Sequence, residues 1–249
     1  MSRPLFLEIP HCYLLKGPGI FLATALMGSI SMVVSMFSST GRTQHKVARA
    51  WARMLLRVAG VKVIVEGLEK IAPGGSYVFI ANHRSYFDVP VILPHISVQF
   101  RFLANQDLFR VPFLGYHLSR AGHVPVNADN PREALKSMSE AGRIIQERGV
   151  SILLFPEAER TDGRLLPFKD GAAYIAIKAG VPIVPIGLIG LREILPVGSS
   201  LVRGGTVRMR IGDPIPTLDL PLSERTALSR LLHQRVGELI EEREEVAVA

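Results

Sequence analysis

SYVFIANHRSYFD, residues 76–88, is an apolar run that ends in a cluster of polar side chains. Continuous runs rich in valine and isoleucine are typical of strands that are covered on both faces of a parallel sheet. Comparable runs occupy residues 61–67, 99–105, 122–127, 150–156, 181–189 and 205–213, and helical patterns lie between several of them. The alternation predicts an α/β fold with a mostly parallel central sheet of about six to seven strands flanked by helices.

Three segments in the second half of the chain show helical patterns. Pro131 stands near the start of segment 131–148, which carries its apolar residues on one side. Segment 170–178 is followed by Gly180, and glycine is the residue that most often ends a helix. A leucine-rich stripe predicts a C-terminal helix over about residues 223–242.

The composition indicates a folded protein with anionic partners. Of its 249 residues 48% are hydrophobic and 20% charged, and the formal net charge is +7. This balance favours an acidic lipid surface, a phosphorylated substrate or nucleic acid. No nucleic-acid partner is expected, because the chain has no zinc-ligand spacing, no RNP-like motif and no aromatic residues interleaved along its basic stretch. The single cysteine, Cys12, excludes an intrachain disulfide and fits a reducing setting.

The N-terminal segment is expected to associate with a membrane. Residues 20–37 form an uncharged run of 18 residues, which is just long enough to cross a hydrocarbon core of about 30 Å as a helix. The run has neither the compact basic start nor the cleavage site of a secretory signal. The alternative interpretation is a helix buried in the core of the protein.

A basic amphipathic helix follows this hydrophobic helix. Its five cations fall within an arc of about 80°, with apolar residues, including the single tryptophan, on the opposite side. The cations are Arg42, Lys46, Arg49, Arg53 and Arg57. Such a helix suits an anionic leaflet, and its charge predicts that the following domain lies on the cytoplasmic side. The alternative is an ordinary solvated helix face. We therefore expect a membrane-associating segment 1–58 and an α/β domain 59–249.

Three polar clusters stand where predicted strands end. They are Asn82 and His83, the segment 105–107, and Glu157 with Arg160. In open parallel sheets, ligands bind beyond the carboxyl ends of the strands. This shared position predicts that the clusters form one site.

His83 and Asp88 have the spacing of a general base and its orienting carboxylate. If the chain folds back after His83, the carboxylate can fix the tautomer of the imidazole and leave the other nitrogen free to take a proton. The sequence has no G-x-S-x-G motif, and Cys12 lies outside the domain, so no nucleophile accompanies the pair. No metal is expected, because no further ligands stand nearby at suitable spacing.

The sequence resembles the glycerolipid acyltransferases typified by 1-acylglycerol-3-phosphate (lysophosphatidate) acyltransferase. NHRSYFD (82–88) resembles the N-H-x-x-x-x-D motif of that family, and FPEAERTDG (155–163) resembles F-P-E-G-T-R-S. GHVPVN (122–127) stands at the place of the second block, and VPIVPIGL (181–188) matches the proline-rich fourth block. The four blocks occur in the family's order, and the resemblance spans about residues 60–215.

The resemblance implies an acyl transfer that needs no cofactor. His83, oriented by Asp88, would deprotonate a lysolipid hydroxyl, which attacks the thioester of acyl-CoA or acyl carrier protein. Arg160 would hold the acceptor phosphate, because a guanidinium binds two oxygens at once. Glu157 would shape the site, and Asn82 and Arg84 complete the predicted substrate-binding set. The implied reaction converts 1-acylglycerol-3-phosphate into phosphatidic acid for phospholipid biosynthesis.

The sequence departs from the family pattern at three places. Asn105 stands where the family has lysine, Ala128 stands where the second block ends in arginine, and Ala158-Glu159 replaces Gly-Thr. Arg132 is a possible substitute for the missing arginine. With fewer cations, the acceptor could instead be another lysophospholipid or a hydroxyl-bearing lipid. Two further functions fit the same fold: a lipid-binding protein without activity, and a hydrolase that uses His83 and Asp88 on water.

Overall fold

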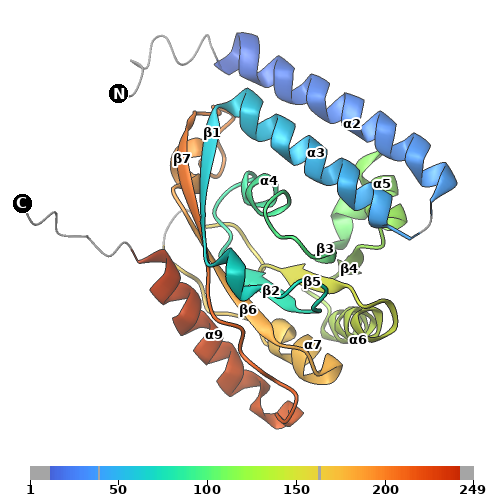
Figure 1. Cartoon of the computed structure of the whole chain (residues 1–249), viewed down its shortest axis with the longest axis vertical. Helices are drawn as coiled ribbons and strands as arrows, with labels where there is room; N and C mark the ends of the chain where they lie inside the picture. Colours follow the sequence, from blue (N-terminus) through green and yellow to red (C-terminus); the bar gives the residue numbers. More distant parts are fainter. Residues whose placement is uncertain (1–11, 39, 162–163, 242–249) are drawn as a thin grey trace, which may run out of the picture.

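The computed structural model describes residues 12–38, 40–161 and 164–241 and has a seven-stranded sheet at its centre (Figure 1). The order of the strands is β1-β7-β6-β2-β5-β3-β4. Each strand lies within one of the seven apolar runs of the sequence. They are β1 (Val61–Glu66), β2 (Val78–Ala81), β3 (Phe100–Asn105), β4 (Val124–Val126), β5 (Ser151–Leu154), β6 (Ile183–Ile189) and β7 (Gly205–Ile211). The α/β fold class is therefore confirmed.

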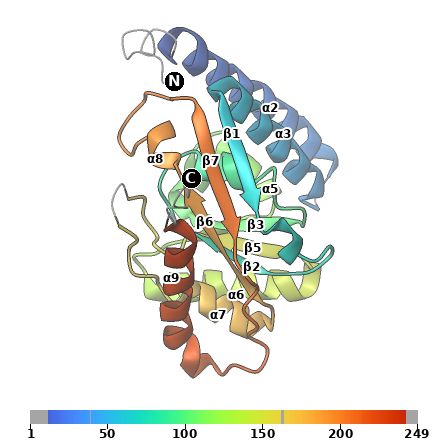
Figure 2. The same ribbon diagram turned by 60° about the vertical axis from the view of Figure 1, so that its left-hand side comes forward.

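The sheet is parallel except at one junction. β6 pairs with β7 in antiparallel register, whereas β2 pairs with both β5 and β6, β3 with both β5 and β4, and β1 with β7, all in parallel. β7 and β1 therefore run against the other strands and form one side of the sheet (Figure 2). The carboxyl ends of β6, β2, β5, β3 and β4 meet at one edge, where ligands of such sheets bind.

Alternating side chains of the central strands enter two separate cores. In β2, Phe79 and Ala81 belong to one buried cluster, and Val78 and Ile80 belong to the other. All four side chains are fully buried. A strand that is covered on both faces explains why the sequence shows a continuous apolar run there instead of alternation.

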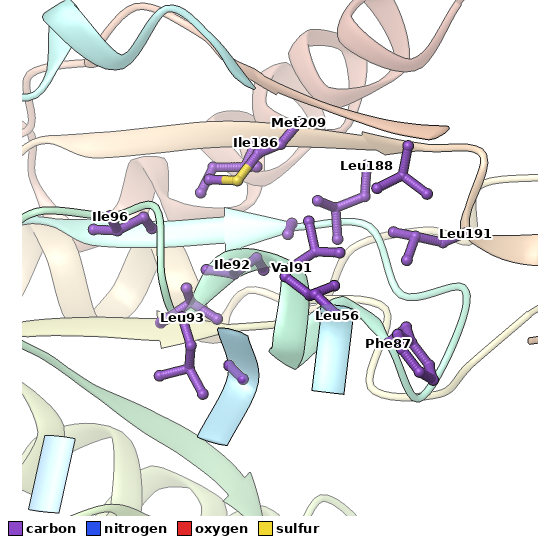
Figure 3. Close-up of a cluster of buried hydrophobic side chains, with 14 of the residues drawn as sticks. Leu56, Phe87, Val91, Ile92, Leu93, Ile96, Ile186, Leu188, Leu191 and Met209 are labelled. Atoms are coloured by element: carbon purple, nitrogen blue, oxygen red, sulfur yellow. The ribbon is translucent and has the colours of Figure 1, made fainter. Parts of the chain in front are cut away.

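One face of the sheet is covered by α3 (Arg42–Ala59) and α4 (Asp88–Ile92), and α8 (Leu191–Ile194) packs into the same core. Figure 3 shows Leu56 of α3 and Val91 and Ile92 of α4 close to Ile186 and Leu188 of β6. Aliphatic side chains of this kind each stabilise the fold by about 1.5–3 kcal/mol when they are fully buried.

The opposite face is covered by α6 (Pro131–Arg148), α7 (Gly171–Ala179) and α9 (Arg225–Ile240). The expected C-terminal helix begins later than predicted, because a 3-10 turn, η4 (Leu222–Glu224), precedes α9. The last predicted residue, 242, lies outside the described residues. Three short segments lie between strands: η2 (Leu68–Lys70) between β1 and β2, and η3 (Gln106–Arg110) and α5 (Leu114–Arg120) between β3 and β4.

Local signals explain the bounds of α6. The Oδ1 atom of Asn130 accepts the N–H groups of Arg132 at 3.1 Å and Glu133 at 3.3 Å, which satisfies two free donors of the first turn. Pro131 stands at the first helical position, and Gly149 ends the helix with φ of 60°. The predicted helix 131–148 is confirmed residue for residue.

The N-terminal helix α2 (Gly17–Phe37), which follows the π-helical turn η1 (Cys12–Lys16), packs along α3 (Figure 1). Trp51 Nε1 donates to Thr24 Oγ1 at 3.1 Å, so the predicted apolar side of the basic helix is covered by α2. The outer side of α2 exposes large apolar side chains, with exposed fractions from 38% to 85%. They are Phe21, Leu22, Leu26, Ile30, Val33, Met36 and Phe37. By length and composition, residues 12–37 meet the requirements of a membrane-crossing helix.

The basic stripe of α3 is exposed at Arg42, Lys46, Arg53 and Arg57, as predicted. Arg49 departs from it. Its Nε donates to the carbonyl oxygen of Leu93 at 3.1 Å, and its Nη2 donates to that of Val98 at 3.3 Å. One of the five cations therefore fastens α3 to the segment after α4 and is not free for a partner.

The turn after β5 has an unfavourable backbone conformation. Ala158 has φ of 65°, in the left-handed region, and its N–H donates to the carbonyl oxygen of Phe155 at 3.0 Å. A residue with a Cβ atom is strained there by roughly 1–2 kcal/mol, whereas glycine is not.

We therefore expect Ala158→Gly to raise the free energy of unfolding by about 1 kcal/mol, because glycine removes this strain. Urea unfolding followed by circular dichroism is the measurement. Ala128→Gly is the matched control: Ala128 is exposed in a turn without positive φ, so glycine there should lower the stability. Equal effects of the two substitutions would contradict the assignment of strain to Ala158.

Candidate active site

The site lies where β2 and β5 end side by side. Ile80 of β2 is in register with Leu154 of β5, so the residues that follow both strands emerge at the same edge. His83 follows β2, and Phe155 and Glu157 follow β5. The parallel pairing brings together two of the polar clusters of the sequence, which are separated by 74 positions.

His83 and Asp88 form a buried pair. The Nδ1 atom of His83 is 2.6 Å from Oδ2 of Asp88, which is fully buried. Because a carboxylate only accepts hydrogen bonds, Nδ1 is the nitrogen that carries the proton, and Nε2 keeps its lone pair. No hydrogen bond reaches Nε2 from any residue that the structure describes. The imidazole therefore has a fixed tautomer and one nitrogen available for proton transfer.

The loop after His83 holds the carboxylate in place. Oδ2 of Asp88 also accepts the N–H groups of Arg84 at 2.8 Å and Ser85 at 3.1 Å. The hydroxyl of Ser85 donates to the carbonyl oxygen of Leu195 at 2.9 Å and accepts the N–H of Phe87 at 3.2 Å. Asp88 is the first residue of α4, so the four-residue loop 84–87 before the helix brings its carboxylate back to His83.

Glu157 supports the backbone of the site. Its Oε1 accepts the N–H of His83 at 2.7 Å, and its Oε2 accepts the N–H of Leu166 at 2.9 Å. Glu157 is 3% exposed, so both oxygens are shielded from water. Its carboxylate therefore ties the end of β2 to the loop after β5 and does not contact the imidazole of His83.

Phe155 orients the ring of His83. The two rings are stacked, with centroids 3.9 Å apart and planes inclined by 13°. Stacking on one face and the hydrogen bond to Asp88 at the edge restrict both rotation and tilt of the imidazole. Phe155 was not predicted as a site residue from the sequence, although its place between β5 and Glu157 is a usable signal.

The amide of Asn82 is engaged by the backbone. Its Nδ2 donates to the carbonyl oxygen of Leu188 at 2.9 Å, and its Oδ1 accepts the N–H of Leu188 at 2.7 Å. Asn82 is 1% exposed. This two-fold pairing fastens the end of β2 to β6 and supports a positioning role in place of the predicted contact with substrate.

The two predicted arginines lie on the loops that flank His83. Arg84 Nη1 donates to Thr161 Oγ1 at 2.5 Å and to the carbonyl oxygen of Arg164 at 3.2 Å, which joins the two loops. The guanidinium of Arg160 lies 4.3 Å from the centre of the Tyr86 ring. Its buried Nε has no hydrogen-bond partner among the residues that the structure describes. Tyr86, another residue missed in the sequence, thus positions Arg160 by stacking.

The polar segment 105–107 and the position of Ala128, where the family pattern has a cation, supply no cation at this edge of the sheet. Asn105 ends β3, and its Oδ1 accepts the N–H of Asp107 at 2.9 Å, which caps η3. Ala128 is exposed in the loop after β4, and Arg132 is exposed in the first turn of α6. Within the described part of the chain, no group of three or more His, Cys, Asp or Glu residues is arranged to hold a metal.

Three other histidines lie away from this edge, near α2, α3 and α5. His123 Nδ1 accepts the N–H of Phe102 at 2.8 Å, and His117 Nδ1 lies 2.5 Å from Ser31 Oγ. Burial lowers the pKa of His117, of His123 and of His45, the last to about 3, with Arg49 and Arg101 as further causes for His45. All three are therefore neutral at pH 7 and act as structural polar groups.

Comparisons with known proteins agree with this geometry. The acyltransferase family model matches residues 62–189. A chloroplastic 1-acyl-sn-glycerol-3-phosphate acyltransferase of Brassica napus is 34% identical over 174 residues, which is 69% of this chain and 50% of the relative. The human enzyme of that name, form alpha, is 27% identical and is matched over 74% of this chain and 65% of its own length.

The fold is also similar to a solved structure. The 1-acyl-sn-glycerophosphate acyltransferase of Thermotoga maritima superposes with a TM-score of 0.76, covers 94% of this chain and 97% of its own, and is 24% identical. This likeness concerns the fold. The chain spans about half the length of the chloroplastic relative from Brassica napus. By its family match and its identity to these relatives, the chain belongs to the acyltransferase family, among members similar to 1-acyl-sn-glycerol-3-phosphate acyltransferases.

Proposed function

We propose that the protein transfers a fatty acyl group from a thioester donor, acyl-CoA or acyl carrier protein, to the free hydroxyl of a lysolipid. The observation that carries the proposal is the buried pair of His83 and Asp88 with Nε2 left free at the sheet edge. The names of the similar proteins support 1-acylglycerol-3-phosphate as the acceptor and phosphatidic acid as the product. The reaction requires no cofactor beyond these substrates.

The mechanism uses His83 as a general base and then as a general acid. Nε2 takes the proton of the acceptor hydroxyl while the oxygen attacks the carbonyl carbon of the thioester. The C–S bond then breaks, and the proton passes from Nε2 to the leaving sulfur. Asp88 stabilises the imidazolium that forms between the two steps. No acyl-enzyme is formed, because the attacking oxygen belongs to the substrate.

Arg160 is the cation that we assign to the acceptor phosphate. Stacking on Tyr86 holds its guanidinium without consuming all of its donors, and its Nε is unpaired within the described residues. A charge-assisted hydrogen bond of this kind contributes about 1.5–3 kcal/mol. Arg84 is engaged by Thr161 and Arg164, so we assign it to the support of the Arg160 loop.

We further propose that α2 attaches the protein to a membrane. Contacts along its length hold α2 on α3, from Gly19 beside Val58 to Ser35 Oγ, which accepts from Gln44 Nε2 at 3.3 Å. Because α3 also packs on the sheet, α2 can present only its outer apolar side to lipid. A helix held in this way lies in one leaflet, with the α/β domain on the cytoplasmic side.

In the proposed division of the chain, segment 1–58 makes the membrane contact and 59–249 forms the catalytic domain. Residues 1–11 of the first segment lie outside the described residues.

The catalytic pair is tested by substitution. His83→Ala should lower kcat for acyl transfer by about 10²–10⁴-fold, because the proposed general base is removed, and Asp88→Asn should produce a loss of similar size. The assay incubates a labelled acyl-CoA with 1-acylglycerol-3-phosphate and separates the acylated lipid from free fatty acid. His95→Ala is the control, because His95 Nδ1 is bonded within its own segment to the Val91 carbonyl oxygen. Free fatty acid as the main product would favour a hydrolase, and full activity of His83→Ala would refute the mechanism.

The role of Arg160 is tested with the same assay. Arg160→Gln should raise KM for 1-acylglycerol-3-phosphate by about 10–100-fold and leave KM for the thioester nearly unchanged. Arg164→Gln, on the same loop and exposed, is the matched control. If Arg160→Gln changes both KM values equally, the arginine supports the loop and does not bind the acceptor.

The membrane contact is tested on the outer side of α2. Leu22 and Val33 are 68% and 57% exposed, so replacing both by glutamate leaves the core intact. A charge within the hydrocarbon region costs about 2.5–3.5 kcal/mol, and the double variant should therefore move from the membrane to the soluble fraction. Leu135→Glu on α6, where the side chain is 47% exposed, should remain with the membrane. Membrane recovery of the double variant equal to that of the wild type would contradict the assignment.

A further inference from the structure

Five large apolar side chains are exposed within nine residues that follow β3. They are Leu108, Val111, Phe113, Leu114 and Tyr116, with exposed fractions of 40%, 45%, 69%, 41% and 42%. We call residues 108–116 the apolar knob; it comprises the end of η3 and the start of α5. A contiguous exposed patch of this kind in a folded protein marks an interaction surface.

The knob places its largest exposed ring in an unfavourable backbone conformation. Phe113 has φ of 64° and ψ of −52°, and the N–H of Leu114 donates to the carbonyl oxygen of Pro112 at 2.7 Å. This is a γ-turn with positive φ, which is rare and strained for a residue with a side chain. Because the ring of Phe113 is mostly exposed, its own burial does not offset the strain. Strain at an exposed aromatic residue points to a function outside the folding of the chain.

The conformation is enforced by the packing of η3 against α5. Gly115 lies so close to Phe109 that a Cβ atom at position 115 would collide with the carbonyl oxygen of Phe109. The N–H of Gly115 donates to the carbonyl oxygen of Val111 at 2.7 Å. The backbone of the knob is therefore held by defined contacts, and these contacts keep the ring of Phe113 exposed.

The helix α5, which begins within the knob, packs against α2. Arg120 Nη2 donates to the carbonyl oxygen of Ser35, and His117 Nδ1 is 2.5 Å from Ser31 Oγ, so α5 touches the C-terminal half of α2. Tyr116 stands one helical turn before Arg120, and the carbonyl oxygen of Phe113 accepts the N–H of His117. Figure 1 shows α5 beside this end of the α2–α3 pair. Leu114 and Tyr116 therefore stand one helical turn before His117 and Arg120, two residues of α5 that contact α2.

The segment that carries the knob has no net negative charge that would oppose an anionic lipid surface. From residue 107 to residue 128 its charged residues are Asp107, Arg110 and Arg120, which sum to +1, and Arg110 Nη1 pairs with Asp107 Oδ1 at 3.1 Å. Phenylalanine and tyrosine flanked by arginine are typical of segments that enter the interface between headgroups and acyl chains.

We propose that the apolar knob is a second membrane-contacting element, which inserts into the same leaflet as α2 with Phe113 leading. The inference rests on the proposed attachment of α2 to a membrane. β3 leads directly into η3, so insertion of the knob brings the carboxyl edge of the sheet, where His83 lies, towards the lipid surface. With both α2 and the knob in contact with lipid, the tilt of the α/β domain relative to the membrane plane is fixed. Contact through α2 alone would leave this tilt free. The hydroxyl of a lysolipid can then reach His83 without leaving the leaflet.

The first experiment measures binding of the full chain to vesicles of phosphatidylcholine and phosphatidylglycerol. Phe113→Asn should weaken binding about tenfold, because a large apolar ring is lost from the interface. Because the ring of Phe113 is 69% exposed, its loss removes little packing, and the unfolding midpoint of the variant should stay close to that of the wild type. Leu218→Asn is the matched control: Leu218 is 74% exposed in the loop before η4, remote from α2, and its loss should leave vesicle binding unchanged.

A second measurement locates the ring directly. The chain has one tryptophan, Trp51, so Trp51→Phe with Phe113→Trp places a single reporter on the knob. Its fluorescence should shift to shorter wavelength on vesicles and be quenched by brominated lipids. Leu218→Trp in the same background should show neither change.

Each of four outcomes would overturn the proposal. These are wild-type binding by Phe113→Asn, a lowered unfolding midpoint that reveals a packing role, and a reporter at position 113 that stays in water. The fourth is a change of oligomeric state in Phe113→Asn with vesicle binding retained, which would assign the knob to a second copy of the chain. If the α2 double variant releases the protein while Phe113→Asn does not, only this inference fails. If the wild type does not bind vesicles, the attachment through α2 fails as well, whereas acyl transfer to a water-soluble short-chain acceptor still tests the chemistry.

Discussion

The parallel pairing of β2 with β5 is the constraint on which the candidate site depends. It places the ends of two distant segments side by side, so that the carboxylate of Glu157 meets the N–H of His83 and the ring of Phe155 meets its imidazole. A shift of the register by one residue would exchange the two faces of the strand and move His83 away from both partners. The chemistry therefore rests on the burial of alternate side chains of β2 in two different cores, which fixes that register.

Most buried polar groups around the site are paired, with Oδ1 of Asp88 and Nε of Arg160 as exceptions among the described residues, and the pairing explains the rigidity of the site. Burying an unpaired polar group costs a few kcal/mol, so Asn82, Glu157 and Asp88 each need donors or acceptors from the backbone. Leu188 supplies both partners of Asn82, and the N–H groups of His83 and Leu166 serve Glu157. These bonds fasten three strands and two loops around one imidazole. A general base benefits from such preorganisation, because less reorganisation is needed when the proton moves.

The N-terminal helices extend the core and present an apolar surface at the same time. α3 contributes side chains to the core beneath the sheet, and its other apolar side is covered by α2, so the predicted amphipathic helix serves packing on two sides. Between α2 and α5, the half-buried His117 contacts Ser31 as a neutral polar group, because burial lowers the pKa of its imidazole. The apolar outer side of α2 and the apolar knob have no such cover within the described chain. Contact with lipid would remove the apolar side chains of both surfaces from water.

The sequence by itself determined the seven strands, the bounds of α6, the long apolar helix and the identity of the His83–Asp88 pair. Each of these follows from signals within a few residues: apolar runs, a capping asparagine, a helix-ending glycine, a motif. It did not reveal α4, α5 or α8, because helices of 4 to 7 residues are too short to show a period. Only the tertiary structure decided that Asn82 pairs with Leu188, that Phe155 stacks on His83 and that Phe113 is exposed at a turn with positive φ. These contacts join positions that are far apart in the chain or depend on how elements pack, and no local pattern of residue types encodes them.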